Sequence, residues 1–136
     1  MTAQPAQPSQ TAQSQPPVLR FRDWDVNIQI SQYAYSGGTA ILLRAADTEH
    51  NKRNGTYPGE PIATASVNLE GADLADNEIA IKDWSENEGM AEWLVINGLV
   101  EDTWKTCAAG HVLAPIVRTL PKLFEIALPA PQHDRP

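Results

Sequence analysis

The segment from Ile79 to Gly98 restricts the possible folds most, because a strand pattern changes into a helix pattern within it. Ile79 and Ile81 alternate with small or polar neighbours, as in a half-buried strand. Further along, apolar side chains recur at the spacing of one helix face. The residues on that face are Met90, Trp93 and Leu94. The segment therefore predicts a strand followed directly by an amphipathic helix.

The ends of this helix also have sequence signals. Ser85-Glu86-Asn87-Glu88 matches a capping box, in which Ser85 accepts from the Glu88 amide and the Glu88 side chain reaches back. Glu86 and Glu88 would then lie in the first turn, where the helix dipole favours negative charge. Asn97-Gly98 is a typical C-terminal stop. These signals predict a helix of about twelve residues.

Strand patterns dominate the rest of the chain. Alternating or continuously apolar runs occupy 24–30, 39–46, 62–69, 78–84, 103–107 and 112–118, and a last short apolar element covers 123–128. Pro115 indicates an edge strand or a bulge, because proline has no amide hydrogen to donate to a ladder. We therefore expect an α+β fold: a mostly antiparallel β-sheet of about five to six strands with one principal helix packed on it.

The chain of 136 residues suits one domain. Residues 1–17 are almost all Gln, Pro, Ala, Ser and Thr, which predicts a disordered tail. A single domain is expected over 18–128, followed by a flexible tail at 129–136. The polar connection from Asp47 to Glu60 is unusually long, and a tolerated insertion is favoured over a functional loop.

The compartment follows from cysteine usage and from the missing targeting signals. Cys107 is the single cysteine, so no disulfide can form within the chain. The N-terminus has neither the basic nor the apolar region of a secretory signal, and no apolar run is long enough to span a membrane. These features predict a cytoplasmic protein without membrane association.

Acidic residues are concentrated between Glu70 and Asp102. This stretch has ten acidic residues and one base, Lys82, within a chain of net charge −7. Direct nucleic-acid binding is not expected, because such proteins usually carry a basic patch. Two interpretations stay open: a solvated acidic face, or a surface that docks on a basic protein partner.

Catalytic and metal-binding motifs are sparse. No zinc, calcium, phosphate-loop or serine-hydrolase pattern occurs, so neither a metal nor a cofactor is expected. Cys107 and His111 lie four residues apart in a predicted hairpin and could approach each other across the turn. A buried cysteine is the commoner situation. No catalytic residue is therefore assigned.

The candidate partner-binding residues lie around the strand-to-helix junction. Trp84 falls on the face opposite Ile79, next to charged residues, where an aromatic side chain can anchor an interface. Packing under the helix is the alternative for Trp84. The other candidates are carboxylates of the acidic stretch. The six candidates are Asp76, Glu78, Asp83, Trp84, Glu86 and Glu92.

Several segments also resemble a family of small proteins of unknown function found in bacteria and on their phages and mobile elements. The resemblance covers 28–118 and is most specific at Asp83-Trp84-Ser85-Glu86-Asn87-Glu88-Gly89. The other contributing segments are Gly38–Ile41, Gly59–Pro61, Ala63–Leu69 and Glu78–Met90. The 47–57 loop and the Gln/Pro-rich tail depart from the family. The resemblance implies phage or mobile-element cargo and no catalytic residues.

These observations predict a non-enzymatic interaction protein that binds a host or element protein through an acidic face. An inhibitor of a host defence system, such as a CRISPR complex or a restriction nuclease, is the sharper version of this hypothesis. Two alternatives stay open: a small enzyme using Cys107 and His111, and a structural or assembly accessory protein.

Overall fold

The computed structural model describes residues 16–33, 38–69 and 72–128. The predicted tails therefore lie outside the described residues, except for Pro16 and Pro17. Half of the predicted turn from Ser36 to Thr39, residues 36 and 37, lies outside them as well.

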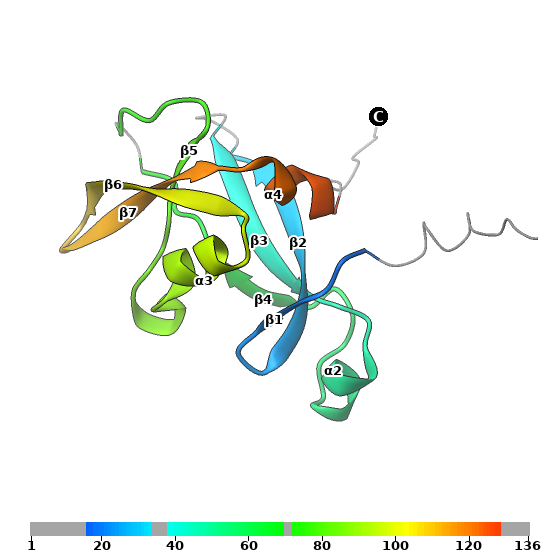
Figure 1. The fold of residues 1–136 in the computed structure, drawn as a ribbon. Helices are drawn as coiled ribbons and strands as arrows, with labels where there is room; N and C mark the ends of the chain where they lie inside the picture. The colour runs from blue at the N-terminus through cyan, green and yellow to red at the C-terminus, as the bar shows by residue number, and fades with distance from the viewer. Residues whose placement is uncertain (1–15, 34–37, 70–71, 129–136) are drawn as a thin grey trace, which may run out of the picture.

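The first half of the chain forms an antiparallel sheet in the order β1-β2-β3-β4 (Figure 1). Its strands are β1 (Leu19–Phe21), β2 (Trp24–Gln32), β3 (Thr39–Ala45) and β4 (Pro61–Thr64). The apolar face predicted for 24–30 is confirmed, since Val26 and Ile28 lie in the core, but Asn27 and Gln29 on the other face are buried too, so the strand is not half-buried. The prediction that 39–46 pairs with this strand is confirmed too.

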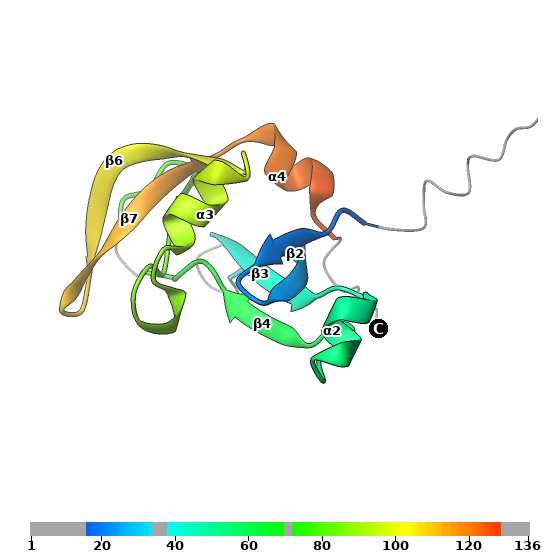
Figure 2. The same ribbon diagram turned by 60° about the horizontal axis from the view of Figure 1, so that its bottom comes forward.

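The second half forms a three-stranded antiparallel sheet in the order β5-β7-β6. Its strands are β5 (Glu78–Ala80), β6 (Val100–Ala109) and β7 (Val112–Thr119). Gly110, with φ 65°, and His111 form the two-residue turn between β6 and β7. Figure 2 shows this hairpin projecting from one end of the molecule, while α2 (Glu49–Arg53) lies at the other end.

The two sheets are joined by the chain that leaves β4. Ser66 forms an isolated bridge with Ile81 just after β5, and its hydroxyl accepts from the Ile41 amide of β3 (2.9 Å). The Tyr33 hydroxyl lies 2.9 Å from the same oxygen. The run at 62–69, predicted as one strand, is therefore split between the two sheets.

The predicted fold class is correct at the level of an α+β fold with antiparallel sheets, and wrong in its details. The described residues form seven strands in two sheets rather than five or six in one. They also form three short α-helices rather than one principal helix. Periodicity identifies which side chains are buried, but it does not specify which strands pair.

Pro115 lies in β7, which is the central strand of its sheet, so the predicted edge position is wrong for the strand as a whole. The Pro115 carbonyl accepts from the Ile81 amide (2.9 Å), just beyond the end of β5. The missing amide hydrogen therefore faces a strand that has already ended. The ladder loses one bond at its terminus, where the loss is smallest.

The connection at 47–60 is not a structureless loop. It contains α2, which begins after Thr48, whose hydroxyl accepts from the Asn51 amide (3.2 Å). Asn51 is buried and makes three side-chain bonds: it donates to the carbonyls of Asp25 and Ala46 and accepts from the Asp25 amide. These bonds fix α2 against the start of β2.

The predicted twelve-residue helix is instead a 3₁₀ turn, η1 (Ser85–Asn87), followed by α3 (Met90–Ile96). Ser85 has φ 55° and Gly89 has φ 89°, so the helix cannot run through them. The capping-box prediction is therefore wrong. The C-terminal stop is confirmed: Gly98, with φ 75°, donates to the Val95 carbonyl in a Schellman motif completed by the Leu99 amide.

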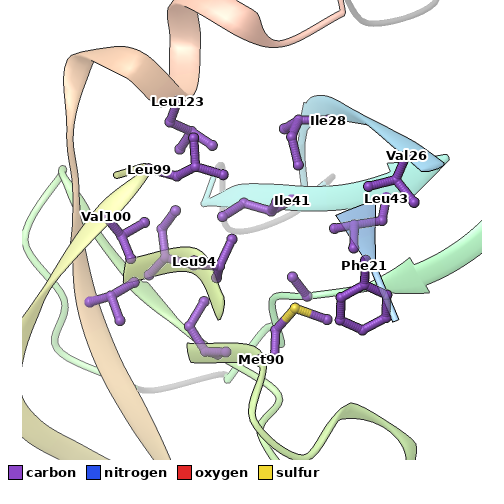
Figure 3. Close-up of a cluster of buried hydrophobic side chains, with 14 residues drawn as sticks. Phe21, Val26, Ile28, Ile41, Leu43, Met90, Leu94, Leu99, Val100 and Leu123 are labelled. Carbon is purple, nitrogen blue, oxygen red and sulfur yellow. The ribbon is translucent and has the colours of Figure 1, made fainter. Parts of the chain in front are cut away.

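The main core lies between the two sheets, α3 and α4 (Pro121–Ile126) (Figure 3). Trp93 packs on this core, its ring 5.3 Å from that of Phe21, and its indole N–H donates to the Arg20 carbonyl. The prediction that Trp93 covers an apolar helix face is confirmed. The fully buried side chains shown in Figure 3 include Ile28, Ile41, Leu43, Met90, Leu94, Leu99 and Leu123.

Candidate interaction surface

Asp83 supplies the N-terminal cap that was predicted for Ser85. Its Oδ1 accepts from the Ala91 amide (3.0 Å), an amide in the first turn of α3 that has no partner within the helix. The chain between Asp83 and Ala91 loops through η1, which places the carboxylate beyond the usual capping position. One of the six candidate binding residues therefore has a structural role.

Replacing Asp83 by alanine should lower the free energy of unfolding by about 1 kcal/mol, the typical cost of a lost cap. Ser85→Ala is the matched control and should leave stability almost unchanged, since no side-chain cap bond is made at η1. Urea unfolding followed by tryptophan fluorescence measures both. Equal losses in the two variants would contradict this assignment.

Trp84 packs on a second, smaller apolar cluster. This cluster lies on the face of the β5-β7-β6 sheet away from the main core and is built on Ala80, Ala114 and Ile116. Trp84 is half-buried against it. Its contacts therefore agree with a packing role rather than with an interface anchor. The packing is not against the helix, however, because Trp84 and α3 lie on opposite faces of the sheet.

Glu86 and Glu78 are held in ion pairs. Glu86 lies 2.6 Å from Lys82, and that hydrogen bond lowers the pKa of the Glu86 carboxyl. Glu78 lies 2.6 Å from Lys105, although its side chain is only 6% exposed. The Lys105 ammonium and the Ala75 amide together lower the pKa of Glu78 below its usual value of 4.5. Both carboxylates are therefore paired with a lysine, and neither presents an unpaired charge to a binding partner.

A lowered carboxyl pKa stabilises the fold above the pKa of the unfolded chain and stops doing so as the pH falls through the folded value. The Glu78 contribution should therefore be complete above about pH 4.5 and be lost below it. Glu78→Gln should flatten the fall in urea midpoint over that acidic range. Asp76→Asn, at an exposed turn, should leave the fall unchanged, and equal slopes in all three proteins would contradict the prediction.

Asp76 and Glu78 meet at a cavity of about 220 Å³, which is also lined by Tyr33, Leu69 and Leu74. The other four candidates do not line it. Glu92 is exposed on α3, and neither Glu92 nor Asp76 has a side-chain partner among the described residues. The structure therefore does not bring the six candidates together.

More than half of the described carboxylates in the acidic stretch make a hydrogen bond or an ion pair within the fold. Glu101 pairs with Arg118 (2.6 Å), and Asp102 accepts a backbone amide, while Glu70 lies outside the described residues. Within the described part of the stretch, four carboxylates make neither a hydrogen bond nor an ion pair. They are Asp73, Asp76, Glu88 and Glu92. The charge available to a partner is therefore smaller than the sequence implies.

Trp104 is the most conspicuous exposed side chain in the described structure. It lies in β6, is 86% exposed, and has a left-handed backbone with φ 65°. A bulky residue rarely adopts this conformation, which costs about 1–3 kcal/mol. Trp104 therefore combines a strained backbone with an indole that buries almost no surface in the fold.

The strained position is built by the two residues before it. The register passes directly from Asp102 opposite Val117 to Lys105 opposite Ile116, so Thr103 and Trp104 form a bulge. The Trp104 amide donates to Asp102 Oδ1 (2.7 Å). The Thr103 hydroxyl donates to the Ile116 carbonyl (2.7 Å) and accepts from the Lys105 amide (3.2 Å). Dedicated side-chain bonds thus hold the indole outward.

Trp104 is not among the candidate residues that the sequence pattern indicates. Asp102-Thr103 was the available signal, because Asp and Thr side chains bond backbone amides two residues on and interrupt regular strands. A continuous strand was predicted at 103–107, and that prediction did not include the bulge.

Cys107 and His111 have different surroundings in the structure. Cys107 lies opposite Ala114 and packs on the same small cluster as Trp84. His111 is exposed in the β6–β7 turn. No hydrogen bond joins the two side chains in the part of the chain that the structure covers.

Two other features are absent from the described residues. No group of three or more His, Cys, Asp or Glu side chains is arranged to hold a metal ion. No helix among them is long and apolar enough to cross a membrane.

Comparisons of the chain with protein-family models, with curated proteins and with solved structures found no match. The resemblance centred on 83–89 therefore stays a prediction, and function must be inferred from the geometry of this chain.

Proposed function

We propose that this chain is a protein-binding module that contacts a basic partner through a surface centred on Trp104. One observation carries the proposal: an indole that is 86% exposed sits on a strained backbone held in place by Asp102 and Thr103. Folding gains little from such an arrangement. Tryptophan is the residue that most often anchors protein interfaces.

Charge favours a basic partner. The chain has a net charge of −7, and α3, which packs against β6, carries the unpaired Glu92. Lys105 and Arg118, the nearby bases of the hairpin, are each neutralised by a glutamate. A phosphate backbone would meet repulsion at such a surface, whereas a basic protein would be attracted. Phage origin and inhibition of a host defence system stay narrower predictions within this function.

The test compares capture of bacterial proteins by the full chain and by its Trp104→Ala variant. A retained protein should bind the variant at least about tenfold more weakly, the usual effect of losing an interface anchor. Ile96→Ala is the matched control, because Ile96 is 73% exposed on α3 and lies outside the bulge. Retained binding should weaken as salt is raised.

Two results would contradict the proposal. One is a set of captured proteins that is identical for the wild type and the Trp104 variant. The other is a failure to capture any protein above background at low salt. Circular dichroism of the variant should match the wild type, since the side chain at Trp104 contributes little to the core.

A further inference from the structure

We propose that the free edge of β6, from Lys105 to Ala109, takes up an extended segment of the basic partner as an additional β-strand beside Trp104. This inference rests on the proposed function and names how the partner binds. It is carried by the position of β6 and by the direction of its backbone groups.

β6 is an edge strand. The sheet order β5-β7-β6 leaves one side of β6 without a neighbour, and Figure 2 shows it along the margin of the projecting hairpin. Outside its own sheet, the backbone of β6 makes no hydrogen bond to any described part of the chain. Lys105, Thr106 and Ala108 are all exposed.

The unpaired amides can be assigned from Pro115. The Pro115 carbonyl faces Ile81 on the β5 side, so the Thr106–Pro115 pair is one that exchanges no hydrogen bonds. The amide and carbonyl of Thr106 therefore point away from β7. Because strand residues alternate, the amide and carbonyl of Ala108 point outward as well.

The turn gives the same assignment independently. A two-residue turn is closed by a hydrogen-bonded pair, here Ala109 with Val112. Ala109 and Cys107 therefore face β7, which again leaves Thr106 and Ala108 facing outward. Two donors and two acceptors thus stand at strand spacing along the free edge.

Native edges are often protected by a lysine and a bulge, and β6 has both. Here the protection is incomplete. Lys105 is drawn to Glu78, on the face of the small apolar cluster, and the bulge exposes Trp104. Leu113, directly opposite Ala108, is 63% exposed. Leu113 lies on the central strand β7, so Trp104 is the large apolar side chain that an added strand would meet at the free edge itself.

The negative net charge of the chain favours a basic segment, rather than a second copy of the chain, as the strand added to β6. Pairing two β6 edges would bring two chains of net charge −7 together. Like charges brought together at an interface are unfavourable. A basic segment would instead add backbone bonds to the edge and place a cation near the Trp104 indole.

The test uses a blocked peptide of alternating lysine and valine and a matched peptide with glutamate in place of lysine. With the full chain at millimolar lysine peptide, amide exchange at Thr106 and Ala108 should slow at least about tenfold. The amides of Cys107 and Ala109 serve as internal controls and should keep their rates. The glutamate peptide should leave all four unchanged.

A variant tests the same edge in the capture experiment. Ala108→Pro removes an outward amide without removing a ladder bond, and should weaken capture at least about tenfold. Ala108→Ser keeps the amide and should bind as the wild type does. Retained tryptophan fluorescence and circular dichroism establish that the proline variant is folded.

Three results would overturn strand addition: no protection at Thr106 and Ala108, equal protection by both peptides, or protection that appears with self-association in sedimentation. Capture that depends on Trp104 but survives Ala108→Pro in a folded variant would overturn this inference and leave the proposed function standing. Capture that ignores both substitutions would remove the proposed function as well.

Discussion

Replacing Leu94 by alanine is expected to lower the free energy of unfolding by about 3 kcal/mol, or the melting temperature by about 10 °C. Leu94 is 0% exposed and lies on the face of α3 that packs into the main core (Figure 3). Removing most of its side chain leaves a cavity where sheets and helix meet. The short helix has few other buried residues with which to compensate.

Ile96 offers a control on the same helix. It is 73% exposed, so Ile96→Ala removes a similar number of atoms without creating a cavity, and the change should stay within about 0.5 kcal/mol. Urea unfolding by fluorescence measures both variants. Similar losses at the two positions would show that α3 is not packed as described.

Asn51→Ala should have the second largest effect, also about 3 kcal/mol. The side chain is 1% exposed, and its loss would leave the Asp25 amide without its acceptor, while the Ala46 carbonyl would keep only the Thr48 amide. Buried polar groups without partners keep their full desolvation cost. Thermal unfolding by circular dichroism should show a single transition at lower temperature.

Arg53→Ala is the matched control, because Arg53 is exposed at the end of α2. It should unfold at almost the wild-type temperature. If Asn51→Ala also unfolds there, α2 would be the tolerated insertion that the sequence suggested. The structure instead shows a segment tied by Asn51 to Asp25 of β2 through two hydrogen bonds and to Ala46, just after β3, through a third.

The strands were well predicted because their signal is local. Alternation at 24–30 and the turn glycine at Gly110 record which side chains are buried and where the backbone needs a positive φ. Gly98 ended α3 for the same reason. Such features depend on a few neighbouring residues, so the sequence alone is sufficient to locate them.

The predicted helix start was wrong because a long-range contact overrides the local capping signal. Ser85-Glu86-Asn87-Glu88 fits a capping box, but Arg22 donates to the carbonyls of Glu86 and Glu88 and holds that turn in place. Arg22 is more than sixty residues away in sequence. The capping role passed to Asp83, and no pattern within the segment could have indicated it.

For the candidate site, too, some features follow from the sequence and others only from the tertiary structure. The sequence by itself determined the acidic composition, the α+β class and most strand positions, since these depend on residue type and spacing. Tertiary structure decided which carboxylates are neutralised, because Lys105 reaches Glu78 across the sheet. It also decided that Trp104, one of four tryptophans, faces outward: the bulge that exposes it exists only because β6 pairs with β7 in a shifted register.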